Sequence, residues 1–448
     1  MKEFFSRISP LLSSEELEIF TKEYEKPAYR GVRVNTLKCT ADRLLSLVDG
    51  IDAQQVTPFC KDGFYIPADC SFSGNHPLHH AGAVYFQEPS AMSAASVLAP
   101  QKGDRVLDLC AAPGGKSTQL ASFLGGTGLL WSNEIVKNRA NILLSNMERC
   151  GVKNCVVSSC DPDTLCEVLS GVFDKVLVDA PCSGEGMFRR DEGARAEWSP
   201  EHSDSCAVRQ LKILNSAKKA LREGGVLVYS TCTFSYAENE GVIEKFLSEN
   251  PDFELIDCGE TFGRRTLSGL ACRIYPMDGG EGHFAAKLRK KESADGVVYR
   301  TAHITEPTPE KRIPSLVREF LADNFYDTSD YEKLLVHGEK VYALPDSCPE
   351  IKGTGVIRAG VLVGEIKKNY FEPAHHLFMS ADIKNIKRVV DLPLSDERVI
   401  RFLKGEEIPV DSDIKGYTAV AVEGVITGFG KVSGGRLKNK YPKGLRLL

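Results

Sequence analysis

The chain has 448 residues, of which 42% are hydrophobic and 26% charged, a composition typical of a globular protein with room for about three domains. No apolar run approaches the roughly 18–20 residues of a membrane span, and the N-terminus lacks the apolar segment of a signal peptide, so we expect a cytoplasmic protein with no membrane partner. The 14 cysteines are scattered without a Cys-x-x-Cys pair, which argues against a disulfide framework and against a metal site. With a net charge of −5, any nucleic-acid partner must be held by local basic patches.

The N-terminal region is predicted to form a small α+β domain. Residues 1 to about 30 carry apolar side chains near helical spacing. Residues 29–36 then alternate apolar and polar side chains as a half-buried strand does, which puts Arg33 and Asn35 on one face. The run 76–80 contains histidines but no carboxylate or cysteine at a familiar ligand spacing, so we expect a loop there rather than a metal site.

The stretch Arg105–Ser117 combines the features of a cofactor-binding turn. An apolar run around Asp108 is short enough to be a buried parallel strand, Pro113–Gly115 allows a sharp turn and close ligand approach, and a helical pattern follows at once. A nucleotide-like cofactor can bind at such a junction. A phosphate-binding P-loop is excluded because Cys110 stands where that motif needs its first glycine, and an ordinary βα turn remains the alternative.

From about residue 103 to 290, apolar strands alternate with helical segments. The predicted strands after the first are 129–133, 155–158, 173–179, 226–230, 253–256 and 283–288. Such alternation implies a mainly parallel sheet with helices on both faces, in which ligands lie at the carboxyl ends of the strands.

Reactive side chains follow three of these strand ends. Glu134 follows the second strand, about twenty residues after the glycine turn, where an acidic group commonly holds ribose hydroxyls. Asp179 ends the fourth strand and leads into Cys182, and the fifth strand leads into Cys232. Because the fourth and fifth strands are neighbours in a doubly wound sheet, we expect both cysteines and the carboxylate to meet beside the cofactor pocket.

Composition changes after residue 290. The segment 291–312 is polar and contains prolines, as a linker does, and the glycine-rich region beyond it is divided into units at 313–360 and 361–448. The stretch Gly430–Arg446 interleaves basic residues with glycines and has no acidic residue. This composition suits contact with a phosphate backbone, with a solvated tail as the alternative.

Three motifs together resemble those of the NSUN/RsmF-type RNA (cytosine-C5)-methyltransferases: Cys-Ala-Ala-Pro-Gly-Gly-Lys at 110–116, Asp-Ala-Pro-Cys-Ser-Gly at 179–184 and Ser-Thr-Cys-Thr at 230–233. Residues 33–35 resemble the family's N-terminal RNA-binding region, and the C-terminal part resembles bacterial RsmF-type enzymes of 16S ribosomal RNA, which carry a PUA-like domain there. The resemblance implies an α/β fold with a Rossmann-like class I core that depends on S-adenosylmethionine (SAM). The expected domains are an N-terminal RNA-binding domain at 1–80, the methyltransferase domain at 81–290, a linker at 291–312, a small C-terminal domain at 313–360 and a PUA-like RNA-binding domain at 361–448.

The resemblance also implies how the chemistry is divided between two cysteines. Cytosine C5 is a poor nucleophile, and addition of a thiolate to C6 turns the ring into an enamine whose C5 can attack the methyl group of SAM. By analogy with the family, Cys232 is that nucleophile, Asp179 hydrogen-bonds or protonates N3, and Cys182 helps to release Cys232 after methyl transfer. The rival assignment makes Cys182 the nucleophile, as in DNA cytosine methyltransferases with Pro-Cys at this place.

The family's remaining contacts carry over residue by residue, with Asp163 as the alternative to Asp161. The expected cofactor-binding residues are Cys110, Ala111, Ala112, Pro113, Gly114, Gly115 and Lys116 on the methionine side, Glu134 at the ribose with Arg139 one turn further, Asp161 at the adenine and Asp179 at the methyl group. The expected RNA-binding residues are Arg33, Asn35, Lys431, Arg436, Lys438, Lys440 and Lys443.

Together these features predict a monomeric, SAM-dependent enzyme that methylates cytidine C5 in RNA, with ribosomal RNA or the small ribosomal subunit as its partner. A tRNA cytosine methyltransferase would share the same core but carry different RNA-binding domains. An exocyclic-amine methyltransferase would need an Asn/Asp-Pro-Pro-aromatic motif where 180–182 reads Ala-Pro-Cys. A non-catalytic ribosome assembly or RNA-binding factor would need neither the cysteines nor the acidic cofactor residues.

Overall fold

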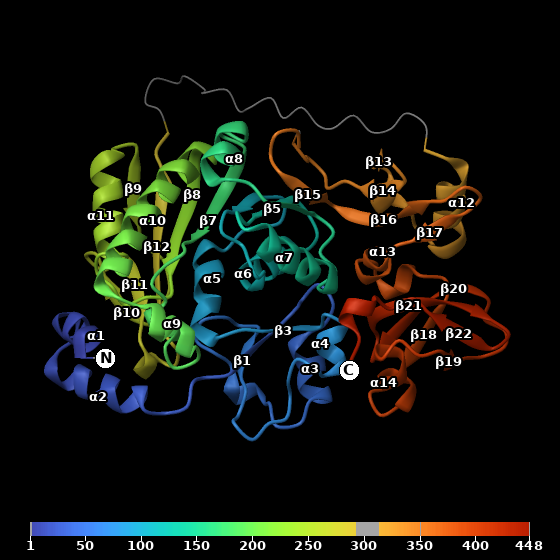
Figure 1. The fold of residues 1–448 in the computed structure, drawn as a ribbon, viewed down its shortest axis with the longest axis horizontal. Coiled ribbons are helices and arrows are strands. Elements are labelled where there is room, and N and C mark those ends of the chain that lie inside the picture. The colour runs from blue at the N-terminus through green and yellow to red at the C-terminus, as the bar shows by residue number, and fades with distance from the viewer. Residues whose placement is uncertain (1, 293–312, 350, 448) are drawn as a thin grey trace.

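The computed structural model describes residues 2–292, 313–349 and 351–447, so nearly all of the predicted linker 291–312 lies outside the described residues. Figure 1 shows an N-terminal domain below a central domain built on a ten-stranded sheet, with a C-terminal region of two smaller sheets to the right. None of the helices in these described ranges is long and apolar enough to cross a membrane.

The N-terminal domain contains short helices and a three-stranded antiparallel sheet in the order β2-β1-β3. Its elements are α1 Lys2–Ile8, α2 Ser14–Tyr24, β1 Gly31–Val34, α3 Ala41–Leu47, β2 Gly63–Tyr65, α4 Pro77–His80 and β3 Val84–Phe86. A capping box between Ser13 and Glu16 starts α2, and a 3₁₀ turn at Ser9–Leu11 divides the predicted helical segment into α1 and α2. The His76 side chain caps α4, so the segment predicted as a loop contains a one-turn helix.

The central sheet has the strand order β10-β11-β12-β8-β7-β4-β5-β6-β15, and β9 pairs with β12. Its strands are β4 Arg105–Asp108, β5 Leu129–Asn133, β6 Cys155–Ser158, β7 Phe173–Asp179, β8 Leu221–Thr231, β9 Phe253–Ile256, β10 Arg264–Thr266, β11 Ala271–Ile274, β12 His283–Lys290 and β15 Val356–Ala359. Strands β4 to β8 run parallel to one another, which confirms the predicted Rossmann-like core.

Helices cover both faces of the central sheet and bury an apolar cluster on each. The helices of this domain are α5 Ser93–Leu98, α6 Gly115–Leu124, α7 Lys137–Arg149, α8 Pro162–Val168, α9 Glu192–Glu197, α10 Pro200–Ala220 and α11 Glu240–Glu249. Helices α5, α6 and α7 supply one cluster, and α8, α10 and α11 supply the other. The predicted strands at β5, β6, β7 and β9 match in both bounds, whereas the short strands β10 and β11 at the antiparallel edge have no predicted counterpart.

The C-terminal region contains a four-stranded sheet, β13-β14-β16-β17, and a five-stranded sheet, β18-β20-β21-β22-β19. Its elements are α12 Ser315–Asn324, β13 Leu334–His337, β14 Lys340–Ala343, β16 Val361–Ile366, β17 Phe371–Pro373, α13 His375–Met379, β18 Val389–Leu392, α14 Glu397–Leu403, β19 Ile408–Pro409, β20 Gly416–Val422, β21 Val425–Ser433 and β22 Arg436–Asn439. Because β14 pairs with β16, the predicted domain boundary at residue 360 falls inside the first sheet.

Strand β15 belongs to the C-terminal region in sequence and to the central sheet in space. It pairs antiparallel with β6. The backbone amide of Ser159 donates to the Gly355 carbonyl, and that of Gly360 donates to the Cys155 carbonyl. The C-terminal region is therefore fixed to the edge of the sheet that carries β6, next to one end of the candidate site.

Candidate active site

The loop between β4 and α6 folds tightly over the carboxyl end of the sheet. The Ala111 amide donates to the Asn133 carbonyl at 2.8 Å, and Gly114 has φ +114°, a conformation that favours glycine. A Cβ on Gly115 would lie 3.2 Å from the Gln87 side chain. The two glycines therefore let the turn pass close to its neighbours and leave a cavity beside the strand ends.

Glu134 and Arg139 connect this turn to the loop after β5. Glu134 is 3% exposed and accepts a hydrogen bond from the Val136 amide at 2.9 Å. Its other carboxylate oxygen lies 3.2 Å from Arg139 Nη1, and Arg139 Nη2 donates to the Ala112 carbonyl at 3.1 Å. Arg139 thus fixes the Glu134 carboxylate relative to the glycine turn.

A cavity of about 1220 Å³ runs along the carboxyl ends of the parallel strands. It is lined by residues including Cys110, Glu134, Asp161, Asp163, Asp179, Cys182 and Cys232. Asp161 caps α8 by accepting from the Asp163 and Thr164 amides. The Asp163 side chain is paired with Lys219 at 3.0 Å, which favours Asp161 over Asp163 as the group available to a ligand.

Asp179 lies at the end of β7 and is the charged centre of the site. Its carboxylate lies 2.8 Å from Lys116 Nζ, accepts a hydrogen bond from Ser230 Oγ at 2.7 Å and lies 3.7 Å from His283 Nε2. Burial on its own would raise the pKa of Asp179, but Lys116 and His283 outweigh it and hold that pKa below its usual range. Asp179 is therefore an anion at neutral pH.

The two predicted catalytic cysteines meet beside this carboxylate. The Cys182 and Cys232 Sγ atoms lie 3.3 Å apart, as expected from the parallel pairing of β7 with β8. The Gly186 amide donates to the Cys232 carbonyl at 2.9 Å and ties the two loops together. The hydrogen bond to Cys232, together with burial, raises the pKa of the Cys182 thiol well above its usual range.

Glu238, which the sequence patterns did not single out, is a buried carboxylate that connects these loops by hydrogen bonds. Glu238 is fully buried and accepts hydrogen bonds from the Ser183 amide and hydroxyl, from Ser203 Oγ and from Gln210 Nε2. It joins the loop carrying Cys182 to the segment after Cys232 and to α10. No signal in the sequence marks it, because it lies in a polar stretch where burial is set only by tertiary packing.

A second cavity, of about 400 Å³, adjoins the first. It shares Cys110, Ala112, Asp179, Ala180 and Cys232 with the first cavity. Its own lining includes Glu88, Met187, Arg190 and His283. Cys232 therefore faces both spaces, whereas Cys182 lines only the first.

The burial of Asp108, at the end of β4, makes the stability of the protein depend on pH. It is fully buried and accepts from Ser117 Oγ at 2.6 Å. Burial, opposed by the Ser117 bond and aided by nearby Asp179, raises its pKa to about 7. The native state then holds a proton that the unfolded chain releases at about pH 4, so stability falls as pH rises from about 4 to 7, with a slope of at most about 1.4 kcal/mol per pH unit.

We expect Asp108→Asn to remove this loss of stability between pH 4 and 7, because the amide carries no charge to desolvate. Urea unfolding of both proteins across that pH range measures the effect. Asp163→Asn, which alters a more exposed carboxylate, is the control. If the free energy of unfolding depended on pH in the same way in the wild type and in Asp108→Asn, the raised pKa of Asp108 would be contradicted.

The two N-terminal residues predicted to bind RNA do not lie on an accessible surface. Arg33 is 1% exposed and donates to the Gly115 carbonyl and to Thr118 Oγ1. Asn35, also 1% exposed, donates to the Gly82 and Cys150 carbonyls. The predicted RNA-binding role of both residues is therefore corrected: β1 packs that face against the central domain, and both side chains tie the two domains together.

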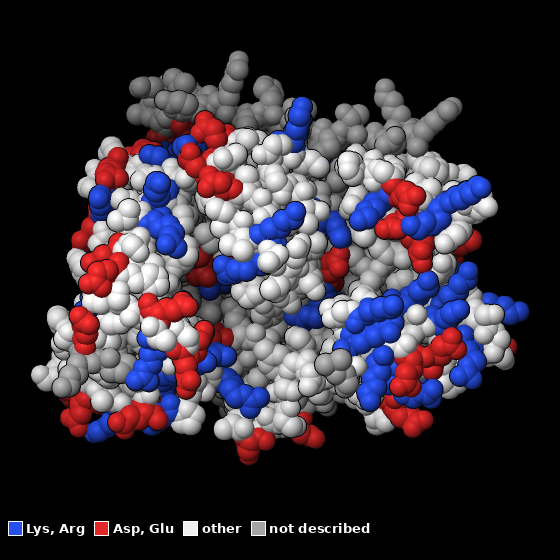
Figure 2. Space-filling view, viewed as in Figure 1, with Lys and Arg blue, Asp and Glu red and all other residues white. Residues whose placement is uncertain are grey.

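The five C-terminal basic residues do lie at the surface. The side chains of Lys431, Arg436, Lys438, Lys440 and Lys443 are exposed. The first four lie on or next to β21 and β22, and Lys443 begins a 3₁₀ turn, so none is in an unstructured tail. Lys431 Nζ lies 5.2 Å from the centre of the Tyr417 ring, and Lys440 pairs with Glu372 at 2.9 Å. Figure 2 shows Lys and Arg side chains gathered over this C-terminal region.

Solved structures with a similar fold are methyltransferases and related proteins. A methyltransferase homologue from Pyrococcus horikoshii is 31% identical, with a TM-score of 0.55 over 64% of this chain and 93% of that one. The NSun6 structure from Pyrococcus horikoshii is 24% identical, with a TM-score of 0.57 over 65% of this chain and 99% of that one. The fold is that of the Rossmann-like methyltransferases.

Family and full-length comparisons are more specific. Family models match residues 95–289 (16S rRNA methyltransferase RsmB/F), 1–89 (N-terminal domain of 16S rRNA methyltransferase RsmF), 319–380 (RsmF rRNA methyltransferase first C-terminal domain) and 389–447 (methyltransferase RsmF PUA domain). Ribosomal RNA small subunit methyltransferase F of Vibrio campbellii and that of Erwinia tasmaniensis are each 32% identical over 99% of this chain and 96% of theirs. The chain belongs to the ribosomal RNA small subunit methyltransferase F (RsmF) family.

Within the described ranges, no group of three or more His, Cys, Asp or Glu side chains is arranged to hold a metal ion.

Proposed function

We propose that this protein transfers a methyl group from SAM to C5 of cytidine in small-subunit ribosomal RNA. The observation that carries the proposal is the position of the two thiols, 3.3 Å apart, beside an ionised carboxylate at the junction of two cavities. Its relatives from Vibrio campbellii and Erwinia tasmaniensis are ribosomal RNA small subunit methyltransferases, which supports the choice of RNA.

The larger cavity suits SAM. Glu134 offers carboxylate oxygens to ribose hydroxyls, Asp161 is available for the adenine, and Cys110 and Ala112 of the glycine turn are available for the methionine part. The remaining lining residues of the turn, Ala111, Pro113, Gly115 and Lys116, line the second cavity. A methyl group carried there would point toward Asp179 and Cys232, where the two cavities meet. The NSun6 relative was solved with SFG, a SAM analogue, which supports the same kind of ligand here.

The chain's own residues account for activation of the base. Cys232, as a thiolate, adds to C6 of cytosine and forms an S–C6 bond, while the C5–C6 double bond is replaced by one between C4 and C5 and N3 takes up a proton from water. SAM supplies the electrophilic methyl group that C5 then attacks. Loss of the C5 proton, cleavage of the S–C6 bond and loss of the proton on N3 return the aromatic ring and free Cys232.

Two observations support Cys232 rather than Cys182 as the nucleophile. Cys232 lines the second cavity, where a base would enter, and Cys182 does not. The raised pKa of Cys182 keeps that side chain a thiol, which is a poor nucleophile but a suitable partner for the release step. Because Asp179 is ionised, it serves as an acceptor for a proton on N3 rather than as the acid that delivers it.

The exposed basic surface of β21 and β22 is proposed to contact the phosphate backbone. We expect Lys431→Glu with Lys438→Glu to weaken binding of a 16S rRNA fragment by roughly 10-fold or more, and to reduce the slope of log affinity against log salt by about one for each phosphate that is no longer bound. Fluorescence anisotropy at several salt concentrations measures both. Lys245→Glu with Lys291→Glu, two exposed lysines of the central domain, is the charge-matched control. Equal losses of affinity in the control and test variants would contradict a specific RNA-binding surface.

Product analysis tests the proposed reaction. The purified protein is incubated with methyl-labelled SAM and unmodified 16S rRNA, small subunits or tRNA, and the RNA is digested to nucleosides. We expect label in 5-methylcytidine from the ribosomal substrates. Label in N4-methylcytidine would contradict C5 transfer, and label only in tRNA would contradict the choice of RNA. The predicted monomeric state and cytoplasmic location remain predictions.

A further inference from the structure

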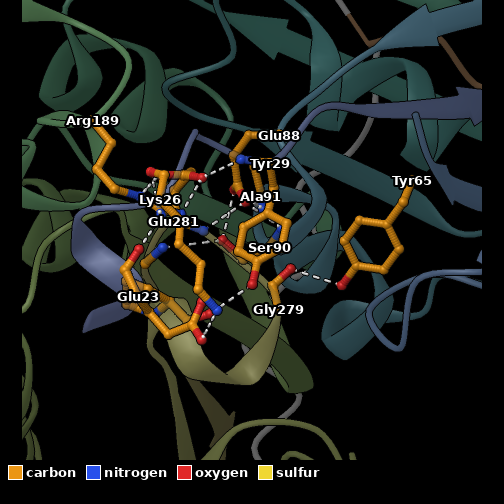
Figure 3. A network of polar contacts seen from close by, with 12 residues as sticks. Glu23, Lys26, Tyr29, Tyr65, Glu88, Ser90, Ala91, Arg189, Gly279 and Glu281 are labelled. Atoms are coloured by element: carbon orange, nitrogen blue, oxygen red, sulfur yellow. Dashed lines mark hydrogen bonds and ion pairs between the residues drawn. The ribbon is translucent and has the colours of Figure 1, made fainter. Parts of the chain in front are cut away.

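A buried ion pair lies next to the site without lining either cavity. Arg189 and Glu281 meet in a two-pronged contact, with Nε 2.7 Å from Oε2 and Nη2 2.7 Å from Oε1. Their side chains are only 4% and 1% exposed. Figure 3 shows the pair meeting beside Tyr29 and Glu88.

Arg189 and Glu281 form further hydrogen bonds with backbone groups from separate parts of the chain. Glu281 accepts a hydrogen bond from the Tyr29 amide at 2.7 Å, and its own amide donates to the Glu88 carboxylate at 2.8 Å. Arg189 also donates to the Glu23 carbonyl at 2.6 Å, and its guanidinium lies 5.4 Å from the centre of the Tyr29 ring. The N-terminal segment, the turn after β3 and two loops of the central domain therefore meet at one ion pair.

Two glycines in close backbone contact lie between the ion pair and Cys232. Gly282 follows Glu281, and Gly186 lies three residues before Arg189. A Cβ on Gly186 would come within 2.8 Å of the Gly282 carbonyl oxygen and 2.9 Å of the Cys232 carbonyl oxygen. Because the three backbones touch, a shift at the ion pair is passed to the loop that carries Cys232.

The same loops and the turn after β3 supply four of the residues that line only the second cavity. Met187 and Arg190 flank Arg189 in sequence, His283 lies two residues after Glu281, and Glu88 is bonded to Glu281 directly. The larger cavity has none of these residues in its lining. These four side chains therefore connect the ion pair to the second cavity and not to the larger one.

A buried ion pair adds little net stability, because desolvating two charges costs about as much as their attraction returns. Such a pair instead favours one arrangement of the groups around it when each charge is also hydrogen-bonded, as both are here.

We propose that Arg189 and Glu281 are positioning residues that set the shape of the base cavity and the position of Cys232. The N-terminal segment is then part of the active-site support, rather than only an RNA-contacting domain. The inference rests on the proposed function, because it takes the second cavity to be the place where cytosine binds.

The test uses Glu281→Gln and Arg189→Lys in the full-length protein, with Glu148→Gln as control. The control breaks another Arg–Glu contact, Arg358 to Glu148 at 2.6 Å, that lies between β15 and α7 and away from these loops. We expect both test variants to lower kcat for RNA methylation roughly 10- to 100-fold, as small misplacements of reacting groups do. The Kd for SAM, measured by calorimetry, should stay at the wild-type value in all three variants and reports that each one is folded.

A second readout does not depend on RNA. In a Cys182→Ala background, Glu281→Gln should change the rate at which iodoacetamide alkylates Cys232, whereas Glu148→Gln should not. Unchanged alkylation and unchanged kcat would overturn the proposal, as would a parallel fall of SAM affinity and kcat, which indicates a merely structural role. Absence of 5-methylcytidine from the wild type overturns the proposed function instead, and the alkylation rates still decide the role of the pair.

Discussion

Cys232→Ala is expected to abolish methylation of RNA, with a fall of roughly 1000-fold or more, equivalent to about 4 kcal/mol in the activation barrier. The reason is chemical: without a bond from sulfur to C6, cytosine C5 has no enamine character with which to attack a methyl group. Cys232 is the thiol that faces both cavities. Steady-state methyl transfer from labelled SAM measures the loss, and binding of SAM to the variant verifies its fold.

Cys182→Ala provides the matched comparison, because its sulfur lies only 3.3 Å from that of Cys232. We expect this variant to form the S–C6 bond but to release it slowly, so that a covalent protein–RNA complex accumulates in the presence of SAM and survives denaturing electrophoresis. The Cys232→Ala variant should give no such complex. A complex that persists without Cys232 and disappears without Cys182 would reverse the roles of the two cysteines.

Asp179→Asn is expected to lower kcat by roughly 100- to 1000-fold, the range seen when one preorganised charge-stabilising group is removed from an active site. The amide cannot balance positive charge at N3, and Lys116 loses its ionic partner at 2.8 Å. Single-turnover methylation with saturating SAM isolates this effect from cofactor binding. Asp163→Asn, in the lining of the same cavity but paired with Lys219, should leave kcat near wild type.

The pH dependence supplies an independent check on Asp179. Burial would raise its pKa, but Lys116 and His283 hold it below the usual range, so the carboxylate stays charged as the pH falls through 5. The acidic limb of the rate profile should therefore not reflect protonation of Asp179. If the wild type showed an acidic limb with an apparent pKa of about 4–5 that vanished in Asp179→Asn, the ionised state described here would be contradicted.

The sequence predicted the parallel core and the meeting of the two cysteines for clear physical reasons. Strands such as β5 and β6 are short apolar runs with polar flanks, and they match the predicted bounds. Parallel strands end at one edge of the sheet, so the residues after β7 and β8 had to come together. No comparable rule marks β15, because its pairing with β6 joins segments about two hundred residues apart in the chain.

The prediction for Arg33 and Asn35 failed for the opposite reason. Alternating polarity shows which residues share a face of a strand, but it does not show whether another domain covers that face. The central domain covers that face, and Arg33 and Asn35 donate to the Gly115 and Cys150 carbonyls of that domain. Glu238 and Arg189 were missed because charged residues are usually exposed, and only tertiary contacts reveal that these two are buried with partners.

Bisulfite sequencing of 16S rRNA from cells that have this protein, lack it, or carry Cys232→Ala in its place tests cytidine methylation by Cys232 in vivo. We expect at least one cytidine that resists conversion only when the wild-type protein is present, and conversion of the same cytidine in the other two strains. An identical pattern in all three strains, or protection that persists with Cys232→Ala, would contradict the proposed function.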